Sequence, residues 1–200
     1  MTTSTPSTTR PLILGSTSPY RRELLARLRL PFDVVAPNLD ETPLANELPR
    51  DLANRLALAK ARAVAQLHPG AVVIGSDQVA DLNGEPLGKP GTHARAVAQL
   101  QRMRGHTVVF QTALAVVCFD SGFEQLDLAA VRVRFRDLSD ADIEVYLQAE
   151  KPYDCAGSAK SEGLGIALLE SIDSDDPTAL VGLPLIRTCR MLRAAGIPLL

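Results

Sequence analysis

The chain of 200 residues has no tryptophan and three cysteines, and aromatic residues make up 4% of it. Cys118, Cys155 and Cys189 are an odd number without C-x-x-C spacing, so neither a disulfide framework nor a zinc site is indicated. A reducing cytoplasm fits this cysteine content best. So few stacking side chains also disfavour an RNA-binding module.

The sequence also lacks an excess of one charge and lacks long apolar runs. Its 21 Lys and Arg residues face 23 Asp and Glu residues, and its pI is about 5.9. This balance disfavours a nucleic-acid coat or a polybasic membrane binder. No apolar run approaches the roughly 20 residues of a membrane span. We therefore expect neither a nucleic acid nor a membrane as partner.

Two parts of the chain differ in composition. Residues 1–10 are rich in Ser and Thr, and we expect them to form a flexible leader. Residues 11–200 are expected to form a single domain, with a core large enough for two lobes.

Hydrophobic periodicity predicts an α/β fold in this domain. Strands are expected over 12–15, 32–36 and 71–74, and helices from Pro19 and over 49–67 and 92–103. Asn83-Gly84 predicts a hairpin. Two long β segments, 107–119 and 124–135, are expected to open a second lobe; a capped helix to Ala149, a strand over 164–169 and a helix over 183–195 follow.

One carboxylate is expected at the end of a buried strand. Gly75-Ser76-Asp77-Gln78 follows the apolar run 71–74 directly. Open α/β sheets bind ligands at such ends, although an aspartate there, taken alone, more often caps a turn. Arg21 and Lys89 change that balance, because a guanidinium and an amine together suit a phosphate. The sequence therefore indicates a nucleotide enzyme.

Glu41 and Lys60 extend this candidate site. Glu41 lies in a loop and by itself reads as a solvated acid, but paired with Asp77 it could hold a hard divalent cation. Lys60 lies on the flank of the apolar stripe of helix 49–67, where a lysine snorkels or reaches into a cleft.

Other chemistries have little support in the sequence. Neither the P-loop motif nor G-x-G-x-x-G occurs. Cys155 has no evident histidine partner for a thiol mechanism, and the acidic run at 173–176 lacks the spacing of a calcium loop, so we expect a polar turn there. Arg132, Arg134 and Arg136 alternate with apolar residues and predict a solvated strand face.

The motifs together resemble the Maf-like nucleoside triphosphate pyrophosphatases. The matching motifs are S-T-S-P-Y-R-R, L-D-E, Lys60-Ala61, G-S-D-Q-V, G-K-P, C-A-G-S and V-G-L-P-L, in order between Leu12 and about Leu192. The resemblance implies a mixed, twisted sheet in two lobes with a central cleft, of the Maf and ITPase-like type. It also implies hydrolysis of nucleoside triphosphates to a monophosphate and diphosphate with Mg²⁺ or Mn²⁺, and suggests a homodimer.

Roles follow from the resemblance position by position. It implies that Asp77 is the general base and, with Glu41, binds the metal, while Ser16, Arg21, Lys60 and Lys89 bind phosphate. Tyr20, Gln78 and Glu162 depart from the dTTP- and UTP-hydrolysing branch and match the branch that acts on 7-methyl-GTP. An aromatic ring and a carboxylate suit a base that carries a positive charge.

Two alternatives stay open at this point. One is an enzyme for dTTP and UTP or of broad specificity, and the other is a nucleotide-sensing binding protein that influences cell division. Asp77, Glu41 and Lys89 are all present, which argues against a sensor without catalytic activity.

Overall fold

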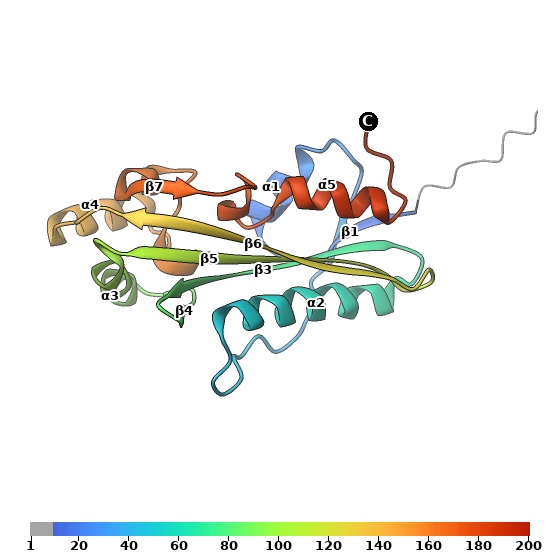
Figure 1. The fold of residues 1–200 in the computed structure, drawn as a ribbon, viewed down its shortest axis with the longest axis horizontal. Helices are drawn as coiled ribbons and strands as arrows, with labels where there is room; N and C mark the ends of the chain where they lie inside the picture. Colours follow the sequence, from blue (N-terminus) through green and yellow to red (C-terminus); the bar gives the residue numbers. More distant parts are fainter. Residues whose placement is uncertain (1–9) are drawn as a thin grey trace, which may run out of the picture.

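The computed structural model describes residues 10–200, which form one mixed sheet flanked by helices (Figure 1). The predicted leader lies, apart from Arg10, outside the described residues. Seven strands follow the order β2-β1-β3-β5-β6-β7, with β4 also paired to β3. The elements are β1 (Leu12–Leu14), α1 (Pro19–Ala26), β2 (Asp33–Val34), α2 (Pro49–Leu67), β3 (Val72–Leu82), β4 (Glu85–Leu87), α3 (His93–Met103), β5 (Thr107–Cys118), β6 (Phe123–Phe135), α4 (Asp140–Glu150), β7 (Leu169–Asp173) and α5 (Leu185–Ala194), with 3₁₀ turns η1 (Ala156–Ser158), η2 (Leu164–Leu168) and η3 (Ala179–Val181).

The sheet is parallel at one edge and antiparallel elsewhere. β1 pairs in parallel with β2 and β3, whereas β3, β5, β6 and β7 pair antiparallel. The mixed α/β class predicted from the sequence is therefore confirmed. Of the helices in residues 10–200, none has the length and apolar content of a membrane span.

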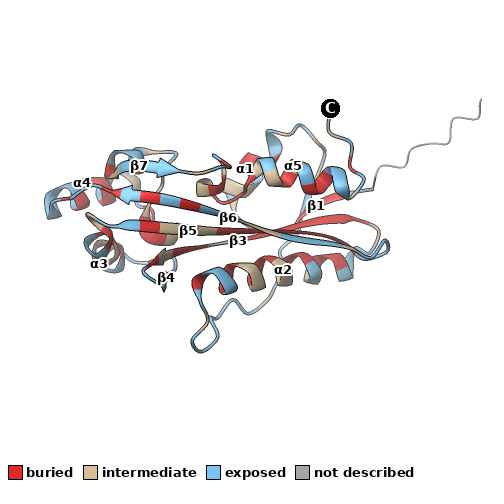
Figure 2. Ribbon diagram, in the orientation of Figure 1, coloured by how far each residue is buried: buried red, intermediate tan, exposed pale blue. Residues whose placement is uncertain are grey.

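Residues of β3 alternate between two helix layers at one end of the sheet. Val73 and Val79 belong to the cluster packed under α2, and Val72 and Ile74 belong to the cluster shared with α1 and α5. Figure 1 shows α2 on one face and α1 and α5 on the other, and Figure 2 shows the buried strands between them. This two-sided burial explains the uninterrupted apolar run 71–74.

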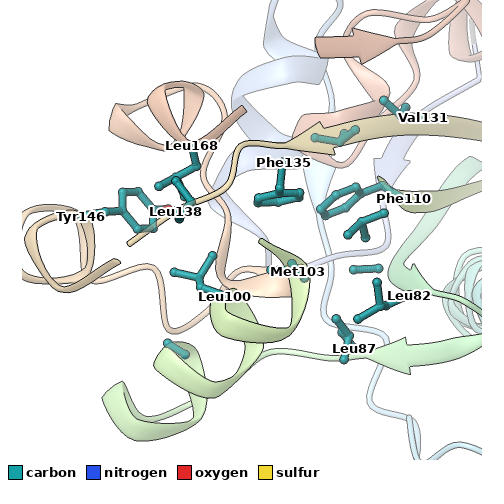
Figure 3. Close-up of a cluster of buried hydrophobic side chains, with 14 of the residues drawn as sticks. Leu82, Leu87, Leu100, Met103, Phe110, Val131, Phe135, Leu138, Tyr146 and Leu168 are labelled. Atoms are coloured by element: carbon teal, nitrogen blue, oxygen red, sulfur yellow. The ribbon is translucent and has the colours of Figure 1, made fainter. Parts of the chain in front are cut away.

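A third cluster fills the other end of the sheet (Figure 3). Phe110 and Phe135 pack there with Met103 and Leu100 of α3 and with Leu138. Because β3 and β5 pair from Val73–Val117 to Asp81–Val109, the same sheet runs through both ends. The segment from residue 107 therefore continues the same sheet as β3, and the division of the domain into two lobes stays a prediction.

Several local predictions are confirmed. α2 begins at Pro49 and ends at Leu67, as predicted, and Ser139 and Asp142 form a capping box at α4. The turn between β3 and β4 holds Asn83 at φ 54° and Gly84 at φ 89°. Those positive values are what a type I′ hairpin requires.

Two strand predictions are wrong and one is too long. Residues 164–168 form the turn η2, and the strand follows it at Leu169–Asp173. The chain is tightly folded there, because a Cβ on Gly165 would lie 2.4 Å from the Lys160 carbonyl oxygen. The predicted strand 32–36 pairs only over Asp33–Val34, at the sheet edge.

The other wrong prediction concerns Asp77. It lies inside β3, opposite Ala113, rather than at the end of a strand. The strand that ends here is β1, whose pairing with β3 stops at Leu14–Ile74. Gly75-Ser76 resembles a strand terminator in sequence, but β3 continues through it to Leu82.

Candidate active site

A cleft of about 760 Å³ opens where β1 stops. The Gly15 amide donates to the Ile74 carbonyl at 2.8 Å, and beyond this bond β3 continues without its parallel neighbour. The cleft brings together every site residue predicted from the sequence: Ser16, Tyr20, Arg21, Glu41, Lys60, Asp77, Gln78, Lys89 and Glu162. The cleft thus lies at the end of a strand, as expected, but that strand is β1 and not the one that carries Asp77.

Lys60 joins two carboxylates in this cleft. Its Nζ donates to Asp77 Oδ1 at 2.7 Å and lies 3.0 Å from Glu41 Oε2. The side chains of Lys60 and Asp77 are 6% and 10% exposed, whereas that of Glu41 is 53% exposed. Lys60 is therefore a buried cation of the site. Of the two arrangements predicted for it, snorkelling to solvent or reaching into a cleft, the structure has the second.

Gly75 allows that contact. A Cβ there would lie 2.3 Å from the Ala57 carbonyl oxygen and 2.6 Å from the Ala61 amide nitrogen of α2. Both distances are far below ordinary van der Waals contact, so the backbones of β3 and α2 touch at this point. The close approach brings Lys60, on α2, to Asp77, two residues after the glycine on the same face of β3.

The N-terminus of α1 forms the adjoining wall. Ser18 caps the helix by accepting from the Arg21 amide, and Pro19 occupies the first turn. Arg21 Nε donates to the Gly182 carbonyl at 2.9 Å, and its Nη1 donates to Ser16 Oγ at 3.4 Å. Burial lowers the pKa of Arg21, and the charges of Asp77 and Glu41 oppose that change. The guanidinium is thus held at a helix end that already favours anions.

Gln78 lies on the opposite face of β3 from Asp77. Its Nε2 donates to Thr112 Oγ1 at 2.9 Å and to the carbonyls of Ala179 and Leu180 at 2.9 and 3.0 Å. Ser76 Oγ similarly donates to Ala113 and Gly182 carbonyls. These bonds tie η3 to the sheet. Because the three bonds of Gln78 use both hydrogens of its amide nitrogen, only its side-chain oxygen is left, as an acceptor, to bind a ligand.

Tyr20 marks the other end of the cleft. Its hydroxyl lies 3.3 Å from Asp154 Oδ2 and 3.8 Å from Cys155 Sγ, and Lys160 Nζ lies 5.8 Å from the ring centroid. Burial, followed by Cys155 and the nearby carboxylates, raises the pKa of Tyr20. Glu162 lines this end as well.

Burial also raises the pKa of the Cys155 thiol to about 12, with Asp154 adding to the effect. The thiol is therefore protonated at neutral pH, which agrees with the sequence-based argument against a thiol nucleophile.

Lys89 and Glu162 line the cleft and form no ion pair with another residue of the range 10–200. Both are exposed, and Lys89 follows β4 at the mouth of the cleft. The acidic run leads into a turn after β7, as predicted, but Asp176 within it is fully buried and accepts from the Arg187 amide at 3.0 Å.

Sequence reasoning missed the partners that come from distant parts of the chain. Asp154 meets Tyr20 across 134 residues, and Gly182 meets Arg21 across 161. Gly182 has φ 119°, so the glycine of V-G-L-P-L was the available signal. The position of Asp154 directly before C-A-G-S was the corresponding signal for that residue.

The carboxylates fit a divalent metal that arrives with a nucleotide. Within residues 10–200 no group of three or more His, Cys, Asp or Glu side chains could hold a metal alone. Glu41 and Asp77, however, flank one cation already, the Lys60 ammonium. Mg²⁺ commonly takes one or two carboxylates and completes its coordination with substrate phosphates and water.

Comparisons with known proteins identify the family of this chain. The family described as "Maf-like protein" matches residues 11–195. A protein of Polaromonas sp. (strain JS666 / ATCC BAA-500) named 7-methyl-GTP pyrophosphatase is 79% identical, covering 96% of this chain and 88% of its own. Proteins of the same name from Albidiferax ferrireducens and Burkholderia pseudomallei (strain 1710b) are 73% and 65% identical, covering 96% and 94% of this chain and 96% and 89% of their own.

Among solved structures, the Staphylococcus aureus Ham1 protein aligns with a TM-score of 0.47 and 15% identity, over 64% of this chain and 73% of that chain. The family match covers residues 11–195, a range that contains all the residues that line the cleft. This chain belongs to the Maf family.

Proposed function

We propose that this protein hydrolyses 7-methyl-GTP to 7-methyl-GMP and diphosphate. The observation that carries the proposal is the Lys60 centre, in which a buried ammonium joins Asp77 to Glu41 beside the N-terminus of α1. The substrate follows from the relatives, which are 61–79% identical and named 7-methyl-GTP pyrophosphatase.

The cationic end of the cleft suits the triphosphate. Arg21 and Lys60 are held by the contacts described above, and Lys89 stands exposed at the mouth. Ser16 adds a hydroxyl next to the first turn of α1. Charge that develops on the α-phosphate and on the departing diphosphate is stabilised by such fixed positive groups.

Asp77 acts as the general base in this proposal. Lys60 engages its Oδ1, and among the described residues no other side chain bonds the carboxylate, which leaves Oδ2 to accept the proton of the attacking water. The water oxygen bonds to the α-phosphorus and its proton passes to Asp77. The bond from the α-phosphorus to the bridging oxygen breaks, and diphosphate leaves with that electron pair.

Glu41 and Asp77 would hold a divalent metal, Mg²⁺ or Mn²⁺. When bound, such an ion polarises phosphoryl oxygens and lowers the pKa of water. Because Lys60 contacts the same two carboxylates, it keeps them close together before the nucleotide arrives.

The other end of the cleft suits a base with a delocalised positive charge. Tyr20 offers a ring on which such a cation stacks, worth about 0.5–2 kcal/mol. Glu162 accepts from the N–H groups of guanine and offsets its charge. The Gln78 oxygen is a further acceptor in the cleft, since its amide nitrogen is already bonded to Thr112 and to η3.

The proposal also includes a cytoplasmic location and a homodimer. Its three cysteines, none of them paired, support a cytoplasmic location. A homodimer rests on the family resemblance alone.

The experiment is pyrophosphate release from an equimolar panel of 7-methyl-GTP, GTP, dTTP and UTP, with Mg²⁺, with Mn²⁺ and with a chelator. We expect metal-dependent release with a preference for 7-methyl-GTP. A preference for dTTP or UTP would support the pyrophosphatase activity but contradict the charge-based explanation of its specificity. Binding without release from any nucleotide would favour the sensor alternative.

A further inference from the structure

Tyr20 is held by side chains from one segment of the opposite wall. Its hydroxyl lies 3.3 and 3.5 Å from the two carboxylate oxygens of Asp154, and the Lys160 ammonium lies 5.8 Å from its ring centroid. Tyr20 belongs to α1, whereas Asp154 and Lys160 follow α4. The contact therefore spans the cleft between two elements far apart in sequence.

The segment that carries these groups is itself anchored to α4. Tyr146 donates its hydroxyl hydrogen to the Ser158 carbonyl at 3.1 Å and accepts from the Lys160 amide at 3.0 Å. Glu150 accepts from the Leu164 amide at 2.6 Å and lies 3.5 Å from Lys160 Nζ. Tyr146 is buried, so the segment is fixed to a packed helix and can serve as a rigid partner for Tyr20.

We propose that Asp154 is a positioning residue that determines specificity by fixing where the Tyr20 ring lies in the cleft. This inference rests on the proposed function, because it presupposes that a cationic base stacks on Tyr20. The torsion χ1 of a tyrosine places its ring, whereas χ2 turns the ring about an axis that passes through the hydroxyl oxygen. A bond to that oxygen therefore restrains χ1. Asp154 supplies such a bond, so the position of the ring is set before the nucleotide binds and less side-chain freedom is lost on binding.

A double-mutant cycle tests whether Asp154 acts through the phenol. Tyr20→Phe keeps the ring and removes the hydroxyl, and Asp154→Ala removes the acceptor. Each should raise the KM for 7-methyl-GTP about 2- to 10-fold, the range of one hydrogen bond, with kcat changed less than twofold. The preference over GTP should fall, and the double variant should be no worse than either single variant.

A binding measurement separates this role from an effect on turnover. Calorimetric titration with 7-methyl-GMP and with GMP, in the presence of a chelator, should give the same loss of preference in Tyr20→Phe and Asp154→Ala. Asp154→Asn keeps an acceptor oxygen and should restore most of the affinity. Tyr153→Phe is the matched control, because its hydroxyl contacts His93 at 3.0 Å and it does not line the cleft; its constants should equal those of wild type.

Additive losses in the cycle would overturn the inference, because Asp154 would then act on the base independently of the Tyr20 hydroxyl. Equal losses in Asp154→Asn and Asp154→Ala would overturn it as well, since charge alone would explain them. The proposed function fails separately, if the wild-type enzyme shows no preference for 7-methyl-GTP.

Discussion

Gly75→Ala is expected to disrupt both the fold and the active centre, because it pushes α2 away from β3. The added Cβ would lie 2.3 Å from the Ala57 carbonyl oxygen, 2.6 Å from the Ala61 amide nitrogen and 2.9 Å from the Ala61 Cβ. Ordinary contact begins at 3.4 Å, so the helix has to retreat by about 1 Å. Its flanking residues, Ala57 and Ala61, are fully buried and leave it little room to adjust.

The expected magnitudes follow from that displacement. Overpacking of this kind costs about 1–3 kcal/mol in the free energy of unfolding, which is about 2–12 °C in Tm for a chain of this length. Lys60 lies between the two clashing residues of α2, so its 2.7 Å contact with Asp77 is lost as well. A misplacement of about 1 Å in a catalytic site lowers the rate on the order of 10²-fold.

The assay combines urea denaturation with kcat/KM for 7-methyl-GTP. Gly70→Ala is the control, because a Cβ there meets only Asp120 Oδ2, at an ordinary 3.5 Å, and its stability and rate should stay near wild type. If Gly75→Ala matched that control in both readouts, the close approach of α2 and β3 would not be what sets the Lys60 contact.

Two further predictions concern charged groups. Lys60→Met leaves the carboxylate of Asp77, 10% exposed, without its cation, so unfolding in urea should show a loss of about 3–5 kcal/mol; adding Asp77→Asn should recover part of it, and no recovery would refute the pairing argument. The bidentate bond from Arg55 lowers the pKa of Glu47 to about 2, below its unfolded value of about 4.3, so the pair stabilises the fold above that value and loses its effect as the pH falls toward 2. The difference in urea midpoint between wild type and Glu47→Gln should therefore shrink between pH 5 and pH 3, and a constant difference would contradict the assignment.

Local signals explain how much of the fold the sequence predicts. Pro49 and the apolar spacing after it define α2 to the residue, and Asn83-Gly84 defines its hairpin, because each depends on neighbours a few residues away. The sequence predicts Asp77 at the end of a strand because its motif directly follows the apolar run 71–74. Gly75 is instead required by α2, a contact that no local pattern reveals.

In the candidate site, too, local motifs predict some residues and tertiary packing determines the others. Motif resemblance identified the residues that line the cleft, and the structure brings all of them to it. Their partners, Asp154 for Tyr20 and Gly182 for Arg21, come from segments more than a hundred residues away. Such pairs depend on tertiary packing, here on the order of strands that brings η3 and the loop after α4 beside α1. Hydrophobic periodicity along the chain therefore cannot predict these pairs.

The most direct test of the central claim is Asp77→Asn, measured for turnover and for nucleotide binding in the same preparation. The substitution keeps the size of the side chain and an oxygen that accepts from Lys60, but removes the base. We predict that kcat for 7-methyl-GTP falls at least about 10²-fold. The Kd for the nucleotide should stay within a few-fold of wild type. Turnover near the wild-type rate would contradict the assignment of Asp77 as the group that takes the proton from water.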